Sequence, residues 1–155
     1  MSRQVLSDQA QSAFVALLRG HSSLTRELNA QLTAEHGLTL NDYEVLLHLS
    51  RAPDQQLKRI DLAQRVLLTA SGITRLLDGL QAEGYVCKGS CASDARITYA
   101  VLTDAGRTKL AAARETHLAG VNQLFAERYD DPELDSLTEL LGRLQANAAA
   151  DDDTC

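Results

Sequence analysis

The chain has 155 residues, of which 45% are hydrophobic and 23% charged, enough for one domain or for one domain plus a pairing element. No apolar run approaches the roughly 20 residues that span a bilayer, and no hydrophobic leader follows the first residues. We therefore expect a cytoplasmic protein without membrane association, in which Cys87, Cys91 and Cys155 are reduced.

The charges are segregated along the chain, so the formal net charge of −6 does not by itself exclude nucleic-acid binding. Residues 58–109 carry eight basic and five acidic side chains, a net charge of +3, which leaves −9 for the remainder. Only this central segment has the sign needed to approach phosphate.

One long helix is predicted at the start of the chain. It begins near Ser7 as N-cap and ends near His36, where Gly37 suits a left-handed residue. Such a helix is over about 40 Å long, more than a small domain covers, so we expect its apolar stripe to contact a second subunit. The stripe contains Phe14, Leu17, Leu18, His21, Leu24, Leu28 and Leu32.

A second helix is predicted from the cap residue Thr39 to about Ser50, with Asp42 placed to bond back to the cap. Pro53-Asp54 then ends it. A short third helix is predicted over residues 58–66.

The fourth helix is predicted to begin after Thr69 and to end at Glu83, followed by Gly84. Residues 85–87 and 97–102 are rich in β-branched and aromatic residues and predict a hairpin, with residues 88–96 as its flexible tip. Helix, turn, helix and hairpin in this order indicate a winged helix-turn-helix, which places one helix in the DNA major groove and the hairpin beside it.

Two further helices are predicted after the hairpin. Thr103 caps the fifth, and Asp131 caps the sixth with Pro132 at its first position. The fold class is therefore mainly α with a small β wing. We predict helical dimerisation regions over residues 1–37 and 107–150, a winged DNA-binding domain over residues 38–106, and a disordered acidic tail over residues 151–155.

The central motifs resemble those of the MarR family of bacterial transcriptional regulators. They are Leu38-Thr39, Asp61-Leu62-Ala63, the run from Ser71 to Leu80, Glu83-Gly84-Tyr85-Val86, Asp94-Ala95-Arg96 and Leu102-Thr103-Asp104-Ala105-Gly106. The resemblance implies an obligate homodimer that binds a pseudo-palindromic operator, usually as a repressor released by a small molecule or by oxidation. Two departures, Gly79 and Lys88-Gly89, remove positive charge that the family commonly places near DNA.

The candidate DNA contacts lie in the fourth helix and the wing. A recognition helix enters the major groove with its N-terminus first, which favours Thr69, Ser71, Gly72, Thr74 and Arg75. The resemblance implies that Arg96 enters the minor groove and that Asp94 braces it; on an extended segment, side chains two residues apart point the same way. Phosphate contacts are expected from Lys58, Arg59 and Lys88, although a solvated surface explains these three nearly as well.

The resemblance also implies an effector pocket between the winged domain and the dimer helices. The candidates for holding an aromatic or phenolic acid there are Arg19, His21, Arg26 and His48. We expect no cofactor, no metal site and no enzyme activity, because no catalytic constellation is evident. Two alternatives stay open: a winged pairing module without DNA binding, and a thiol switch through Cys87 and Cys91, for which incidental cysteines are the commoner explanation.

Overall fold

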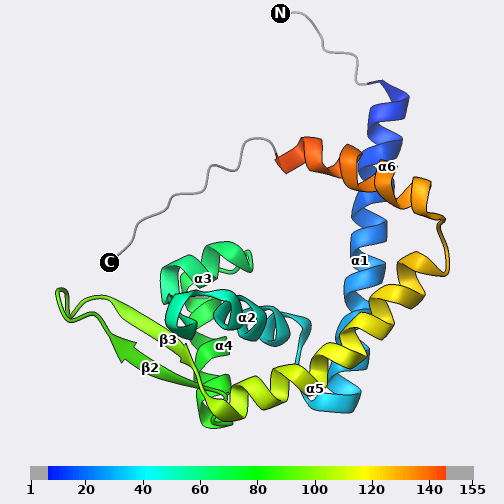
Figure 1. Ribbon diagram of the computed structural model, residues 1–155. Helices are drawn as coiled ribbons and strands as arrows, with labels where there is room; N and C mark the ends of the chain where they lie inside the picture. The colour runs from blue at the N-terminus through cyan, green and yellow to red at the C-terminus, as the bar shows by residue number, and fades with distance from the viewer. Residues whose placement is uncertain (1–6, 146–155) are drawn as a thin grey trace, which may run out of the picture.

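The computed structural model describes residues 7–145 (Figure 1). Its first element is the long helix α1 (Asp8–His36), and the predicted bounds are confirmed. The Ser7 side chain accepts a hydrogen bond from the Ala10 amide, and Gly37 ends the helix with φ +66°. The predicted tail over residues 151–155 and Cys155 lie outside the described residues.

Helix α2 (Leu40–Arg51) begins with the predicted capping box. The Asp42 amide donates to Thr39 Oγ1 at 3.1 Å, and the Thr39 amide donates to Asp42 Oδ2 at 2.8 Å. After the 3-10 turn Pro53–Gln55 come α3 (Arg59–Arg65) and α4 (Ala70–Ala82), within two residues of the predicted bounds. Two of the three helix starts in the winged domain therefore have side-chain caps that the sequence predicts.

The sheet differs from the predicted hairpin in two respects. It has three antiparallel strands in the order β1-β3-β2, comprising β1 (Gln56–Lys58), β2 (Val86–Ser90) and β3 (Thr98–Leu102). β1 was not predicted, because three residues with two polar side chains give no strand pattern. Residues 88–90 belong to β2 and not to the loop: Gly89 pairs with Tyr99, and a Cβ there would lie 3.0 Å from Val101 Cγ2.

The last helices are α5 (Asp104–Val121), a π-helical turn Asn122–Ala126 and α6 (Asp131–Gly142), followed by the 3-10 turn Arg143–Gln145. Thr103 caps α5 as predicted, and its side chain accepts from the Gly106 amide. The predicted cap of α6 is one residue off. Asp130 is the N-cap and forms a capping box with Glu133, because this register lets both side chains bond the free amides.

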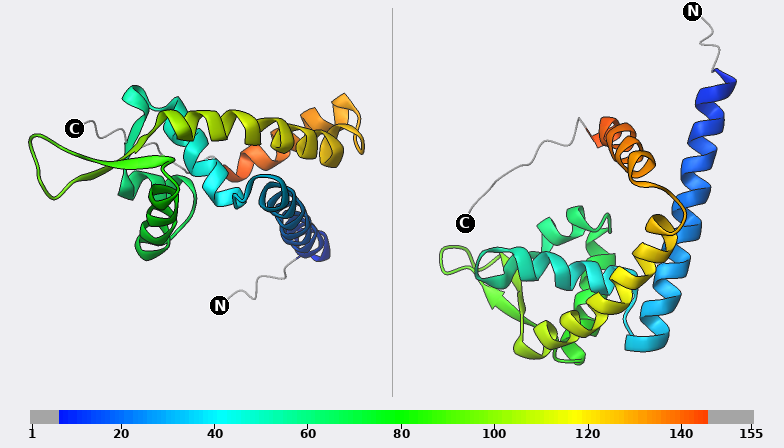
Figure 2. Two further views of the ribbon diagram at one scale, coloured as in Figure 1. Left: turned by 90° about the horizontal axis from the view of Figure 1, so that it is seen from below. Right: turned by 45° about the vertical axis from the view of Figure 1, so that its right-hand side comes forward.

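One core holds the winged domain together and includes part of the terminal helices. Its largest fully buried side chains are Leu32 from α1, Leu46 and Leu49 from α2, Leu62 from α3 and Ile73 from α4. The N-terminal half of α1 lies away from this core, and the hairpin projects from the opposite side of the molecule (Figure 2).

Helix α5 connects the two parts. Near its start Gly106 packs against the Tyr85 carbonyl, and near its end Gly120 packs against Leu28 and Gln31 of α1. Thr116 on α5 accepts from or donates to His36 Nε2 at 2.8 Å and donates to Glu35 Oε2 at 2.7 Å. Through these contacts α5 holds α1 and the winged domain in a fixed relative position.

His117 also lies in this region, where α5 meets α2. Its ring lies 4.4 Å from the ring of Tyr43, centroid to centroid, and its buried Nδ1 has no hydrogen-bond partner among residues 7–145. Burial lowers the pKa of His117, because a charged imidazole is poorly solvated there.

The low pKa of His117 predicts that acid destabilises the fold. The unfolded chain takes up a proton near the ordinary histidine pKa of about 6.5, before the folded chain does, so the free energy of unfolding falls as the pH drops below that value. His117→Phe keeps a ring against Tyr43 and should flatten this slope in urea titrations between neutral pH and mild acid. Burial and the neighbouring arginines also lower the pKa of His48, so His48→Gln should remove a further part of the pH dependence of the unfolding free energy. An unchanged slope in both variants would contradict the assignment.

Gly106→Ala should destabilise the fold, because the new Cβ would overlap the Tyr85 carbonyl oxygen and lie 2.7 Å from Leu102 Cδ1. Overpacking of this kind costs about 1 to 3 kcal/mol. Gly79→Ala is the matched control, since nothing lies within 4 Å of its Cβ position, and it should stabilise α4 by about 0.5 to 1 kcal/mol. Urea denaturation of the two variants should therefore give opposite shifts; equal shifts would refute this packing account.

Candidate nucleic-acid interface and adjoining cleft

The start of α4 presents short polar side chains on an exposed helix N-terminus. Thr69 Oγ1 accepts from the Gly72 amide at 3.1 Å and lies 3.2 Å from Ser71 Oγ. Thr69 and Ser71 are both exposed. A helix N-terminus with free amides and a positive dipole end favours an approaching anion.

Gly72 has a local role that the sequence analysis did not anticipate. A Cβ at this position would lie 3.1 Å from Thr69 Oγ1 and 3.7 Å from Leu68 Cβ. The glycine therefore leaves room for the cap of its own helix, in addition to any room it leaves for DNA.

Arg75 and Thr74 follow on α4 with different surroundings. Arg75 is exposed and makes no hydrogen bond or ion pair within residues 7–145. Thr74 is half-buried, donates to the Ala70 carbonyl at 2.9 Å and accepts from Arg59 Nη1 at 3.3 Å. Arg59, for which a phosphate contact or a solvated surface was expected, thus also connects α3 to α4.

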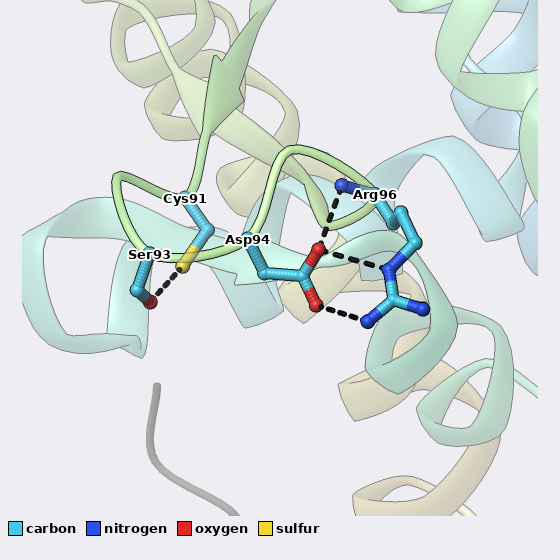
Figure 3. Close-up of polar contacts among 4 residues, drawn as sticks. All are labelled: Cys91, Ser93, Asp94 and Arg96. Atoms are coloured by element: carbon cyan, nitrogen blue, oxygen red, sulfur yellow. Dashed lines mark hydrogen bonds and ion pairs between the residues drawn. The ribbon is translucent and has the colours of Figure 1, made fainter.

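The loop after β2 holds the most defined polar contact of the domain (Figure 3). Arg96 Nε donates to Asp94 Oδ1 and Arg96 Nη2 donates to Asp94 Oδ2, both at 3.1 Å. The Arg96 amide also donates to Asp94 Oδ1 at 3.0 Å. Because the arginine bonds stabilise the carboxylate, the pKa of Asp94 is lowered. The guanidinium is thereby held in one orientation while 91% of the Arg96 side chain stays exposed.

The predicted contact between Asp94 and Arg96 is present, but the reason given for it was wrong. These residues lie in a turn and not on an extended segment. The carboxylate bonds the backbone amide two residues ahead, as aspartate does in an Asx-turn, and this bond brings the two side chains together.

The remaining candidate cations lie around α4. Arg59 is the first residue of α3 and is exposed, Lys58 is the half-buried cap residue of that helix, and Lys88 is exposed on β2. With Arg75 and Arg96 they make five cations among the DNA-binding candidates, and Asp94 is the one acidic candidate. Asp78, also exposed, lies on the same helix as Arg75.

The expectation that the cysteines are reduced is wrong for Cys91, which is disulfide-bonded. The alternative of a thiol switch through Cys87 and Cys91 is not supported either. Cys87 is a free, exposed thiol, and Cys91 is half-buried with Sγ 3.1 Å from Ser93 Oγ (Figure 3). Since β2 is extended through Ser90, four residues separate the two Cα atoms by about 13 Å. A disulfide needs less than about 7 Å, so the proposed switch through a Cys87–Cys91 bond is incompatible with the formed strand.

A cleft with a volume of about 660 Å³ lies between α1, the start of α2 and the α3–α4 turn. Of the four effector candidates it brings together His21 and Arg26. Arg19 lies instead in a groove on α1 with Asp8 and Val15, and His48 does not line the cleft.

Two charged residues of the cleft, Glu44 and Arg65, were missed. Arg65 ends α3 and Glu44 lies on α2, so only the tertiary fold brings them to α1. The turn that completes the cleft includes Leu67, which is 90% exposed and has φ +56°.

The sequence model of the MarR family matches residues 36–97, which contain α2, α3, α4 and the wing loop. The transcriptional repressor YetL of Bacillus subtilis is 32% identical over 72% of this chain and 66% of its own length. The chain belongs to the MarR family of transcriptional regulators.

Two further transcriptional regulators match over almost the whole chain. The regulator MhqR of Bacillus subtilis is 26% identical over 92% of this chain and 96% of its own length. The structure of Sco3205, a MarR family regulator from Streptomyces coelicolor in complex with DNA, has a TM-score of 0.86 with 24% identity, covering 98% of this chain and 96% of that one. Across residues 7–145, no helix is long and apolar enough to cross a membrane.

Proposed function

We propose that this MarR regulator is a cytoplasmic homodimeric repressor that reads a pseudo-palindromic operator and is released by a small aromatic acid. The observation that carries the proposal is the bidentate Asp94–Arg96 contact at the wing, beside an α4 whose N-terminal residues and Arg75 are exposed. A guanidinium already held in one orientation loses little conformational entropy when it binds.

The proposal that the protein binds DNA rests on the shape of the winged domain and on its positive charges. The cations Arg59, Arg75, Lys88 and Arg96 come from the start of α3, from α4 and from the hairpin, the elements that a winged helix-turn-helix turns toward DNA. Sco3205, which shares the fold, was solved in complex with DNA. We assign Arg75 to a base edge or a phosphate in the major groove and Arg96 to the minor groove.

The homodimer is supported by apolar side chains that the single chain leaves uncovered. Phe14 is 60% exposed and Leu18 51% on α1, while Leu118 on α5 is 51% and Leu140 on α6 is 53%. A long helix whose N-terminal half exposes its apolar stripe is stabilised when a second copy covers that stripe. The dimerisation regions proposed for residues 1–37 and 107–150 contain these positions.

The effector site is proposed in the cleft between α1, α2 and the α3–α4 turn. It lies where a ligand would contact both a dimerisation helix and the turn that precedes the recognition helix. A molecule bound there can stabilise one spacing of the two recognition helices over another. If the stabilised spacing does not match the operator, the protein dissociates from DNA.

Removing the two arginines separately should give different defects. Arg96→Ala should weaken binding to every duplex by a similar factor, since the minor-groove contact is indifferent to most sequence. Arg75→Ala should cost about 1 to 3 kcal/mol and relax the preference at one base pair if it reads a base. Sequences selected from random duplex DNA, followed by fluorescence anisotropy at two salt concentrations, measure both effects.

Arg128→Ala is the charge-matched control, because Arg128 follows the π-helical turn at the far end of α5 from the wing and is exposed. It should bind like the parent protein. If Arg75→Ala and Arg96→Ala do so too, or if no sequence is enriched, the winged-helix pairing module without DNA binding becomes the better explanation.

The dimer is tested by a charge on the exposed stripe. Leu18→Glu should shift the sedimentation coefficient toward that of a monomer, because burial of a carboxylate in an apolar interface is costly. Ile60→Glu is the matched control: Ile60 is 66% exposed, but it lies on α3 away from the stripe, so this variant should remain a dimer. A dimeric Leu18→Glu protein would place the interface elsewhere.

A further inference from the structure

The cleft beside α1 contains side chains of both charges that are not joined in ion pairs. Arg26 and Arg65 line it and form no ion pair within residues 7–145. Glu44 lines the same cleft from α2, is half-buried and accepts no hydrogen bond from any described residue. These charged groups are therefore available to form ion pairs with a bound ligand.

The polar groups are distributed along the cleft. At one end the Leu40 amide donates to Asn29 Oδ1 at 2.9 Å, so that amide oxygen already has a partner. One turn further along α2, Glu44 is close enough to His21 for the imidazole charge to act on its carboxyl group. The carboxylate is therefore separated from the Asn29 end by about one helical turn, roughly 6 Å.

Glu44 is destabilised as an anion where it lies. Burial raises the pKa of its carboxyl group, and the charge of His21 offsets this only in part. A hydrogen-bond donor on a bound molecule, above all a cationic one, would restore the interactions that the carboxylate loses by leaving water.

We propose that Glu44 is the specificity-determining residue of this cleft and that it selects an effector which carries an ammonium group as well as a carboxylate. The carboxylate would pair with Arg26 or Arg65, and the ammonium group with Glu44. This inference rests on the effector site proposed above and narrows its ligand from an aromatic acid to an amino-substituted one.

A plain aromatic acid complements the cleft less well. Its carboxylate is attracted by the two arginines but repelled by Glu44, and its apolar end leaves Glu44 without a donor. A buried polar group left unpaired by the wrong ligand is the usual physical origin of strong discrimination.

Three benzoates that differ only in the para substituent test this inference: para-methylbenzoate, para-(hydroxymethyl)benzoate and para-(aminomethyl)benzoate. Calorimetric titration of the full-length protein should give the tightest binding for the aminomethyl compound and the weakest for the methyl compound, with about tenfold between them. Glu44→Gln has the same shape without the charge and should abolish the preference for the aminomethyl compound. Removal of the arginine that holds the carboxylate, by Arg26→Ala or by Arg65→Ala, should weaken all three probes by a similar factor.

The outcomes separate this inference from the function on which it rests. If para-methylbenzoate binds and releases DNA as well as the aminomethyl compound does, the effector site stands and the role of Glu44 is refuted. A preference that persists in Glu44→Gln refutes it as well. If none of the three binds at millimolar concentration, both the proposed class of ligand and the proposed effector site are refuted. The order of the three affinities in the parent protein tests the preference for an ammonium group even if a variant fails to fold.

Discussion

The packing of α5 against both parts of the molecule is the constraint on which the rest of the structure depends. At its start, Gly106 allows the helix to touch the Tyr85 carbonyl at the end of the winged domain, and near its end Gly120 allows it to touch Leu28 and Gln31 of α1. In the proposed homodimer the spacing between the two winged domains follows from how the terminal helices pair, because helices transmit rigid displacements. A cleft that lies between α1 and the α3–α4 turn is therefore well placed to change that spacing.

The charges of the chain are also divided between the winged domain and the terminal helices. The net negative chain concentrates its positive charge in residues 58–109. Five of those eight cations lie at the start of α3, on α4 and on the hairpin, while Arg65 ends α3 and Arg107 and Lys109 lie on α5. The Asp94–Arg96 contact orients one of them without burying it. Gly79 and Gly89 stand where the family commonly has basic residues, so fewer cations are available to contact phosphate. We therefore expect the salt dependence of DNA binding to be shallow for the family.

The sequence predicted most helix bounds correctly because caps and stops are local. Ser7, Thr39, Thr69 and Thr103 act through bonds within three residues, and Gly37 and Gly84 through their own φ. What failed depends on tertiary contacts. β1 is a strand only because Gln56 to Lys58 pair with β3, and Glu44 and Arg65 join His21 and Arg26 only after α1, α2 and α3 pack together. The Asp94–Arg96 contact was predicted, but for the wrong reason, because a local turn forms it. The cap of α6 was missed by one residue because two aspartates, Asp130 and Asp131, are adjacent and only the bond to Glu133 distinguishes them.

Hydroxyl-radical footprinting of the protein on a selected operator tests most directly whether two copies of the winged domain read DNA together. The account predicts two symmetric sets of protected sugars on one face of the duplex, with centres about one helical turn apart, roughly 34 Å, and protection of the flanking minor grooves that disappears in Arg96→Ala. A single protected patch, or two sets on opposite faces of the duplex, would contradict the paired arrangement. Protection unchanged by Arg96→Ala would contradict the role given to the wing.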